Sequence, residues 1–385
     1  MKNLLCCFLI SFTFLKSNAQ NITEHTGSLP QKLKVKIDSI FVKFNELDSP
    51  GFAIGIIKDT TILYRNGYGS ANLDYNIPIT PNSVFDIASV SKQFTAACIA
   101  LLIMDKKLTL DTPVQKYVSE LSKYRDTIRI EHLIYNTSGL TDYFKLPRKN
   151  AKSWLGFYYF DIDEAIRTSL SQDTLAFKPG DKWDYCNVNY MLLTKVVEKL
   201  SGMPFSEFIE ERLFKPLGMN STIVNDDITE IVKNRVTPYN ERTPLYIDAY
   251  KKEGIKVKRK GKWIEHHRNS PHYGGSGVLS SVNDLLRWSE NFFTKKFGGE
   301  KFYNLMHKTM KFKHEMDNQA FGLYFGEYKK RTFVAWEGAT AGISSQLIRF
   351  PKQKIAIAVL SNLGSGKADE KAYKIADILI DAAIL

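Results

Sequence analysis

Two hydrophobic patterns follow each other in the early part of the chain. Apolar side chains recur at helical spacing between residues 33 and 44, which predicts an amphipathic helix. Residues 52–57 are instead an unbroken apolar run, and Asp59-Thr60 leads from it into residues 62–64, as in a β-hairpin. The apolar series from residue 94 to residue 104 predicts a buried helix.

Helical patterns dominate the middle of the chain and strand patterns return near its end. Helices are expected at 163–170, 188–200, 205–213 and 368–385, and late strands at 322–325, 333–335, 344–350 and 355–360. Strands at both ends around a helical middle predict an α/β lobe made of residues 20–107 and 270–385. A mainly helical lobe, 108–269, would be inserted between them, with the functional site in the cleft.

The composition agrees with a two-lobed globular protein. Of 385 residues, 44% are apolar and 24% charged, which excludes intrinsic disorder and a collagen-like repeat. Single cores rarely grow beyond about 300 residues, so the length also predicts two lobes. The formal charge of +12 allows nucleic acid, an anionic membrane surface or an acidic substrate as partner, and does not choose among them.

Residues 1–19 have the pattern of a secretory signal peptide. Lys2 precedes an apolar run at 4–15 that is too short to cross a bilayer, and small residues allow cleavage after Ala19. We therefore expect a periplasmic or secreted protein. Only Cys98 and Cys186 lie outside this segment, and we expect two separate thiols rather than a disulfide framework.

The candidate nucleophile lies in the only Ser-x-x-Lys sequence of the chain, Ser89-Val90-Ser91-Lys92. This sequence opens an apolar helical run, and helix residues i and i+3 share a face, so the Lys92 amine can reach Ser89 Oγ. A serine hydroxyl needs a base at neutral pH, and a lysine can serve if burial or neighbouring cations lower its pKa. The positive end of the helix would also stabilise an oxyanion formed at Ser89.

The segment 85–96 resembles the nucleophile segment of the serine β-lactamase and penicillin-binding-protein superfamily. The branch it resembles comprises class C β-lactamases, family VIII carboxylesterases and D-amino-acid peptidases, and further matching segments follow in the same order at 108–114, 130–140, 177–187, 216–219 and 275–281. The resemblance implies a β-lactamase-like α/β (α+β) fold. In that fold an antiparallel sheet of about five or more strands is flanked by helices, with an inserted all-helical lobe.

Tyr185-Cys186-Asn187 matches the superfamily's second element, Tyr-x-Asn. A phenol can shuttle a proton if a nearby cation such as Lys92 stabilises its phenolate. Asn187 offers a donor and an acceptor to Lys92 or to a substrate amide. Residues 64–66 show the same pattern, but they run into an Asn-Gly turn signal at a strand end, which argues against them.

Trp336-Glu337-Gly338 stands where the superfamily carries Lys-Thr-Gly or His-x-Gly. The resemblance implies that Gly338 allows close approach of substrate and that the Ser89 and Ala339 N–H groups form the oxyanion hole. Trp336, which some family VIII esterases share, cannot hold a substrate carboxylate as Lys or His would. This departure favours neutral esters or amides over penicillin-type substrates.

Glu337 leaves two interpretations open. Its carboxylate beside the site could bind a substrate amine, as an aminopeptidase or amidase would require. Alternatively its side chain points away from the cleft, because strand residues alternate between faces.

Residues 251–268 carry eight Lys or Arg against two Glu and read as a basic hairpin of strands 255–259 and 262–265. It could contact an anionic cell-envelope surface, although charge runs are usually solvated. No nucleic-acid-binding motif accompanies it. The adjacent His266 and His267 would point to opposite faces of a strand, so we predict no metal site.

Together these features predict an exported serine hydrolase that acts on a small ester, amide or peptide through a Ser89 acyl-enzyme. Lys92 and Tyr185 would serve both half-reactions, and no cofactor is expected. One alternative is a β-lactamase, D,D-carboxypeptidase or D-aminopeptidase acting on cell-wall-type peptides. The other is an inactive ligand-binding protein with this fold, against which the joint presence of Ser89, Lys92, Tyr185 and Asn187 argues.

Overall fold

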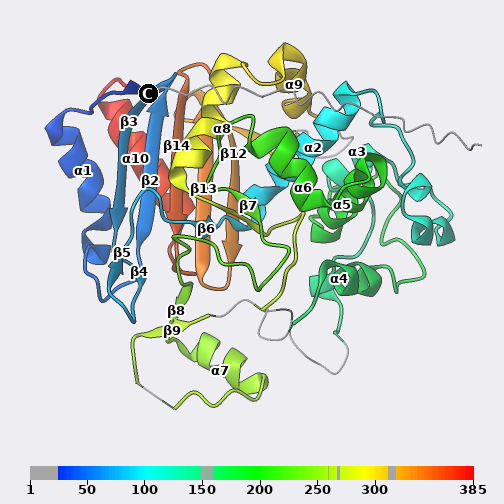
Figure 1. Ribbon diagram of the computed structural model, residues 1–385, viewed down its shortest axis with the longest axis horizontal. Coiled ribbons are helices and arrows are strands. Elements are labelled where there is room, and N and C mark those ends of the chain that lie inside the picture. Colours follow the sequence, from blue (N-terminus) through cyan, green and yellow to red (C-terminus); the bar gives the residue numbers. More distant parts are fainter. Residues whose placement is uncertain (1–24, 149–153, 155–158, 259, 267–268, 311–317) are drawn as a thin grey trace, which may run out of the picture.

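A seven-stranded sheet forms the centre of the computed structural model, which describes residues 25–148, 154, 159–258, 260–266, 269–310 and 318–385 (Figure 1). The predicted signal peptide lies outside these residues. The strand order is β1-β3-β2-β14-β13-β12-β11, antiparallel except for β1 beside β3. The strands are β1 His25–Thr26, β2 Phe52–Lys58, β3 Thr61–Tyr68, β11 Tyr324–Tyr328, β12 Arg331–Thr340, β13 Ile343–Phe350 and β14 Ile355–Ser361.

Helices cover both faces of this sheet. Helices α1 (Gln31–Phe41) and α10 (Ala368–Asp381) pack on one face, and α8 (Val282–Thr294) packs on the other against β2 and β14. Every residue of β13 and of β14 is buried, because each strand has neighbours in the sheet and helices above and below. This explains why β14 is a nearly continuous apolar run rather than an alternating pattern, whereas β13 also carries buried polar residues.

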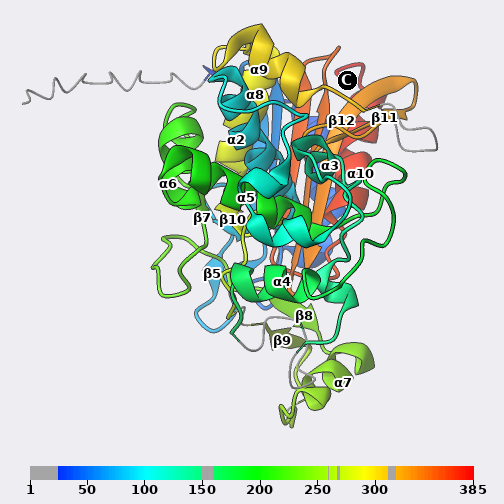
Figure 2. The ribbon, with the colours of Figure 1, turned by 90° about the vertical axis from the view of Figure 1, so that its right-hand side faces the viewer.

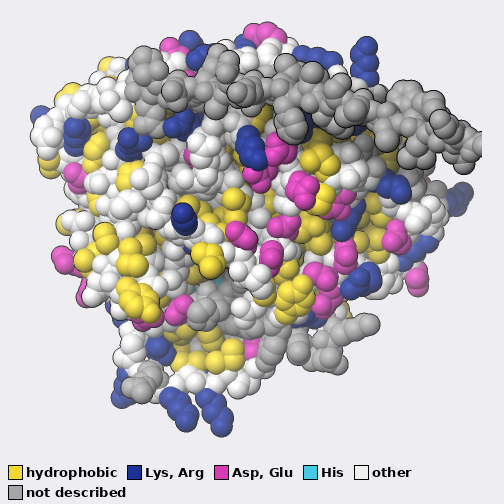
Figure 3. Space-filling view, in the orientation of Figure 1, with side chains coloured by type: hydrophobic (Ala, Val, Ile, Leu, Met, Phe, Trp, Pro, Cys, Tyr) yellow, Lys and Arg dark blue, Asp and Glu magenta, His cyan; other side chains and the backbone are white. Residues whose placement is uncertain are grey.

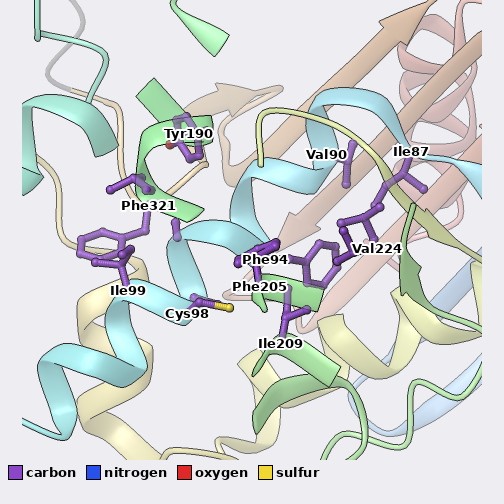
Figure 4. Close-up of a cluster of buried hydrophobic side chains, with 14 of the residues drawn as sticks. Ile87, Val90, Phe94, Cys98, Ile99, Tyr190, Phe205, Ile209, Val224 and Phe321 are labelled. Atoms are coloured by element: carbon purple, nitrogen blue, oxygen red, sulfur yellow. The ribbon is translucent and has the colours of Figure 1, made fainter. Parts of the chain in front are cut away.

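Further helices gather beside the sheet (Figure 2). They are α2 Lys92–Met104, α3 Ile130–Ile134, α4 Ile162–Ser169, α5 Asn187–Ser201, α6 Phe205–Ile209 and α9 Gly299–Met306. Helix α2 is buried from Lys92 to Leu102, and Figure 4 shows its Phe94 and Cys98 beside Phe205 and Ile209 of α6, with Ile99 on the side of Phe321. Cys98 and Cys186 are both buried free thiols, as expected. No helix in the described part of the chain is long and apolar enough to span a membrane.

Most predicted elements are present, with shifted ends. Strand β11 begins at Tyr324 rather than at residue 322, because Gly322 has a left-handed φ of +66°. A side chain at this position would approach the backbone nitrogen of Gln93 within 2.6 Å, so the chain passes too close to α2 to pair as a strand there. The lobe boundaries at residues 107 and 270 stay a prediction.

The prediction that residues 255–259 and 262–265 pair with each other as a basic hairpin is wrong. Strand β9 (Trp263–Glu265) pairs with β8 (Tyr239–Glu241), and the described residues 255–258 form no strand. The reason is local: the Thr243 side chain caps α7 (Pro244–Lys252), and the chain turns back through Gly254, whose φ is +76°. This β8–α7–β9 segment projects from the rest of the molecule (Figure 2). His266 is buried, and His267 and Arg268 lie outside the described residues.

Candidate active site

Ser89 lies on a one-turn 3-10 helix, η2 (Ala88–Ser91), that leads directly into α2. The small sheet β6-β10-β7 holds this turn, with β6 at Phe85–Asp86, β7 at Ile223–Val224 and β10 at Val278–Ser280. The N–H of Val278 donates to Ser91 Oγ at 3.0 Å. Ala88 adopts a φ of +45°, unusual for a residue with a side chain, and its N–H donates to Asp86 Oδ1 at 2.8 Å. Strained backbone therefore presents Ser89.

The structure brings the predicted catalytic side chains together. Ser89 Oγ is 2.7 Å from Tyr185 Oη and 3.3 Å from Lys92 Nζ. The Lys92 ammonium also lies 4.6 Å from the centre of the Tyr185 ring. Both candidate proton acceptors thus contact the same hydroxyl, which is the arrangement that nucleophile activation requires.

Lys92 is completely buried and surrounded by acceptors. Its amine donates to Asn187 Oδ1 at 2.8 Å and to the carbonyl oxygen of Gly275 at 2.5 Å. Burial lowers the pKa of Lys92 to about 7, with the Asp142 carboxylate acting against this shift. A neutral amine can donate two protons to these acceptors and still accept the proton of Ser89 at the third, longer contact.

Asp142 is a site residue that the sequence reasoning missed. It is buried, and its Oδ2 accepts from both the backbone N–H and the side-chain Nδ2 of Asn187. Its other oxygen accepts from the Phe144 N–H at 3.0 Å. Asp142 lies two residues after the 130–140 segment used for the resemblance, so its position near a matched motif was the only available signal.

The ionisation of the Tyr185 phenol differs from the sequence-based expectation that Lys92 would stabilise its phenolate. Burial raises the pKa of Tyr185 well above its usual value, although the hydrogen bond with Ser89 opposes the rise. The proximity of Lys92 thus does not lead to a resting phenolate. Tyr185 is a neutral phenol at pH 7, and Lys92 is the better base.

Strand β12 forms the opposite wall of the site. A side chain at Gly338 would come within 2.9 Å of the Ser89 nitrogen and 2.5 Å of the Ile87 carbonyl oxygen, so only glycine lets the strand lie this close. Ser345 Oγ, on the adjoining β13, donates to the same Ile87 carbonyl at 2.8 Å. Ala339 follows Gly338 and lines the same cavity as Ser89, as the predicted oxyanion hole requires.

The cavity above Ser89 has a volume of about 830 Å³. Its lining includes six aromatic side chains, Tyr143, Phe144, Trp183, Tyr185, Tyr324 and Trp336. The Trp336 ring lies nearly parallel to that of Tyr185, with centres 6.4 Å apart. None of the described residues that line it is Lys or Arg, although His272 contributes an imidazole to the lining.

Glu337 also lines this cavity, at its exposed rim. It lies on the face of β12 opposite to Trp336, because successive strand residues alternate. Burial raises the pKa of its carboxyl group, and the nearby Asp369 carboxylate adds to the rise. The side chain therefore leaves the Trp336 face and still reaches the cavity, and binding of a substrate amine by Glu337 stays a prediction.

The second Tyr-x-Asn sequence, at residues 64–66, takes no part in the site. Tyr64 donates to Asp38 on the α1 side of the sheet. The expected strand end is absent, since β3 continues to Tyr68. Gly67 serves close packing instead, because a side chain there would overlap the Ile79 carbonyl.

The sequence model of the Beta-lactamase family matches residues 37–380, and the chain belongs to this family. It is 25% identical over 341 residues to a D-aminopeptidase of Gluconobacter oxydans, covering 88% of this chain and 60% of the relative. It is 28% identical over 313 residues to a penicillin-binding protein of Bacillus subtilis, covering 78% of this chain and 65% of the relative. The chain thus spans about three fifths of the length of these relatives.

A solved structure supports the fold. The octameric penicillin-binding protein homologue from Pyrococcus abyssi superposes with a TM-score of 0.74 at 24% identity, covering 91% of this chain and 77% of that one. The predicted superfamily and fold class are confirmed. The roles of individual residues stay predictions that rest on the contacts above.

Proposed function

We propose that the protein is a serine hydrolase that cleaves ester or amide bonds through an acyl-enzyme on Ser89. One observation carries this proposal: the hydroxyl of Ser89 contacts both Tyr185 Oη, at 2.7 Å, and the buried Lys92 amine, at 3.3 Å. A lysine with a pKa of about 7 is half neutral at physiological pH, so it can take up the hydroxyl proton. The names of the relatives, a D-aminopeptidase and a penicillin-binding protein, agree with such chemistry.

The proposed reaction has two halves. Ser89 Oγ forms a bond to the substrate carbonyl carbon while its proton passes to Lys92, directly or through Tyr185. The N–H groups of Ser89 and Ala339 stabilise the oxyanion, and the proton then moves to the leaving group as the ester or amide bond breaks. Water attacks the carbonyl carbon of the acyl-enzyme and gives a proton to the same pair. The bond to Ser89 Oγ then breaks, the proton returns to this oxygen, and the acid is released. Lys92 and Tyr185 therefore serve both halves.

The cavity lining favours neutral or cationic substrates over carboxylates. Among the described lining residues, the carboxylates are Glu337 and Asp369, and none is a Lys or Arg that could pair with a substrate carboxylate. We therefore rank ester or amide hydrolysis above a β-lactamase or D,D-carboxypeptidase activity. An inactive binding protein would not need a buried, acceptor-bound lysine, whose burial costs stability.

Acylation by probe substrates tests the proposal. The protein is incubated with p-nitrophenyl acetate, nitrocefin and a fluorescent penicillin, and adducts are identified by mass spectrometry, with Ser89→Ala as control. We expect a Ser89-dependent acetyl adduct and turnover of the ester. Fast nitrocefin hydrolysis would reverse our ranking, and the absence of any Ser89-dependent adduct would favour the binding protein.

We also propose export, on the basis of Lys2 and the apolar run that follows it. Expression of the full chain in a bacterial host, followed by mass determination, tests this. A product beginning at Gln20 in the periplasm or medium is expected, and an uncleaved cytoplasmic product would contradict it.

A peripheral contact of the β8–α7–β9 segment with an anionic surface is a further proposal. Figure 3 shows Lys and Arg side chains around a hydrophobic patch at this end of the molecule, where Leu245 is 76% exposed. Sedimentation with anionic and neutral vesicles tests it, and Lys251→Gln with Lys252→Gln should reduce only anionic binding. Equal sedimentation with both kinds of vesicle would contradict it.

A further inference from the structure

The cavity carries a charge pattern opposite to that of a carboxylate-binding site. Glu337 and Asp369 are the acidic side chains in its lining, and they come from β12 and from the first turn of α10. Neither forms a hydrogen bond or ion pair with another residue that the structure describes. Lys367 and Lys371 lie close enough to interact with the Asp369 carboxylate, whereas no cation is found near Glu337 among the described residues. The Glu337 carboxylate is therefore available to a cationic group of a substrate.

A buried amide group in the cavity lining also lacks a partner. Gln319 lines the cavity with 4% of its surface exposed, and its side chain forms no hydrogen bond within the described part of the chain. Gln346, which stands directly opposite Glu337 on β13, is fully buried and is engaged by Tyr324 instead. Buried polar groups are normally paired, so Gln319 indicates that something polar occupies the cavity.

Aromatic rings border the same region. Tyr324 packs edge-on against Trp336, with ring centres 5.8 Å apart, and both line the cavity. Aromatic faces attract organic cations, and together with carboxylates they are a common way to recognise an ammonium group. A metal ion would be a poorer occupant, since no cluster of three or more acidic, His or Cys ligands is found among the described residues.

We infer that Glu337, with Asp369 beside it, binds an ammonium group of the substrate at the β12 end of the cavity. This inference rests on the proposed hydrolase function and names its substrate class: esters or amides that carry a positively charged amine. Glu337 precedes Ala339 by two residues, so the amine-binding position lies about 7 Å along the strand from the proposed oxyanion hole. Glu337 is thus a specificity-determining residue, whereas Ser89, Lys92 and Tyr185 perform the chemistry.

Kinetics on paired substrates provide the first test. Alanine p-nitroanilide is compared with propionyl p-nitroanilide, and 2-aminoethyl acetate with propyl acetate, so that each aminated substrate has a neutral partner. Glu337→Gln should lower kcat/KM about tenfold or more for at least one aminated substrate and leave its neutral partner within about twofold. Glu327→Gln, an exposed carboxylate on β11 outside the cavity lining, is the matched control.

Binding to the inactive Ser89→Ala protein separates this inference from the proposed function. Benzylamine and benzyl alcohol are titrated calorimetrically into this variant and into its combinations with Glu337→Gln and Asp369→Asn. Preferential binding of benzylamine that is lost with Glu337→Gln supports the inference even if the wild-type protein hydrolyses none of the probes. Equal binding of the two ligands, or a preference unchanged in Glu337→Gln, overturns it.

Discussion

Asp142 accepts hydrogen bonds from both the backbone and the side-chain nitrogen of Asn187. Because the Asn187 Nδ2 is used in this way, its Oδ1 must face the Lys92 amine, which it contacts at 2.8 Å. Asp142 therefore orients Asn187, and Asn187 in turn orients Lys92, the proposed base. It also adds a negative charge close to that base, which opposes the effect of burial on the pKa of Lys92.

The pH profile of the enzyme should report the ionisation of Lys92. Only the neutral amine can accept the Ser89 proton, so kcat/KM should rise with pH through a midpoint of about 7. Asp142→Asn removes a charge that favours the protonated amine, so this midpoint should move to lower pH. Rates of p-nitrophenyl acetate hydrolysis between pH 5 and 9 provide the measurement, with Asp105→Asn, at the surface near Arg212, as control. A midpoint that moves upward would contradict the assignment.

Burial of Lys92 should cost stability in a pH-dependent way. The unfolded chain holds this proton up to its ordinary pKa of 10.5, whereas the folded protein releases it at about 7. Between these two pH values the unfolded state thus binds more protons than the folded state. The destabilising contribution of Lys92 therefore becomes smaller as the pH rises from about 7 to 10.5. Lys92→Met should stabilise the protein by about 2 kcal/mol at pH 7 and by less at pH 10, while abolishing turnover. Denaturant unfolding at both pH values measures this, and a destabilised variant at pH 7 would refute it.

Tyr185→Phe isolates the contribution of the phenol. The ring would still pack beside Trp336, but the contact with Ser89 Oγ would be lost. We expect kcat to fall about 100- to 10,000-fold, with little change in thermal stability. Stopped-flow acylation and melting curves measure the two effects. A variant with wild-type acylation would assign the proton transfer to Lys92 alone.

The close approach of β12 to Ser89 makes Gly338 intolerant of a side chain. Gly338→Ala would place a methyl group within 3 Å of the Ser89 nitrogen, the Ile87 carbonyl and Ser345 Oγ. We expect a loss of about 1–3 kcal/mol in stability and a larger loss of activity, because the oxyanion hole would widen. Gly261→Ala serves as control, since its nearest neighbours are 3.7 Å away. Equal effects of both substitutions would contradict the packing argument.

The sequence predicted the elements that local pattern determines. The apolar run of β14 and the helical spacing of α1 were recognised because burial leaves a periodic trace in the chain. The Ser89 and Tyr185 segments were found because their motifs resemble those of a known family. Gly275 opens one of the matched segments, but the sequence did not indicate that it or Asp142 would lie beside Lys92, because both reach this lysine only through the fold. It also misassigned the partner of β9, since pairing with β8 depends on where α7 ends.

The pairing of β2 with β14 at the centre of the sheet joins the two ends of the chain. Phe52 lies opposite Ser361, so about three hundred residues must be synthesised between the two partners before this contact can form. A nascent chain that has already produced Ser89, Lys92 and Tyr185 still lacks β12 and the strands that hold it. Catalytic competence therefore arises only after β14 has been synthesised, and truncation before β14 should leave the chain unfolded and inactive even though it retains the Ser89 and Tyr185 motifs.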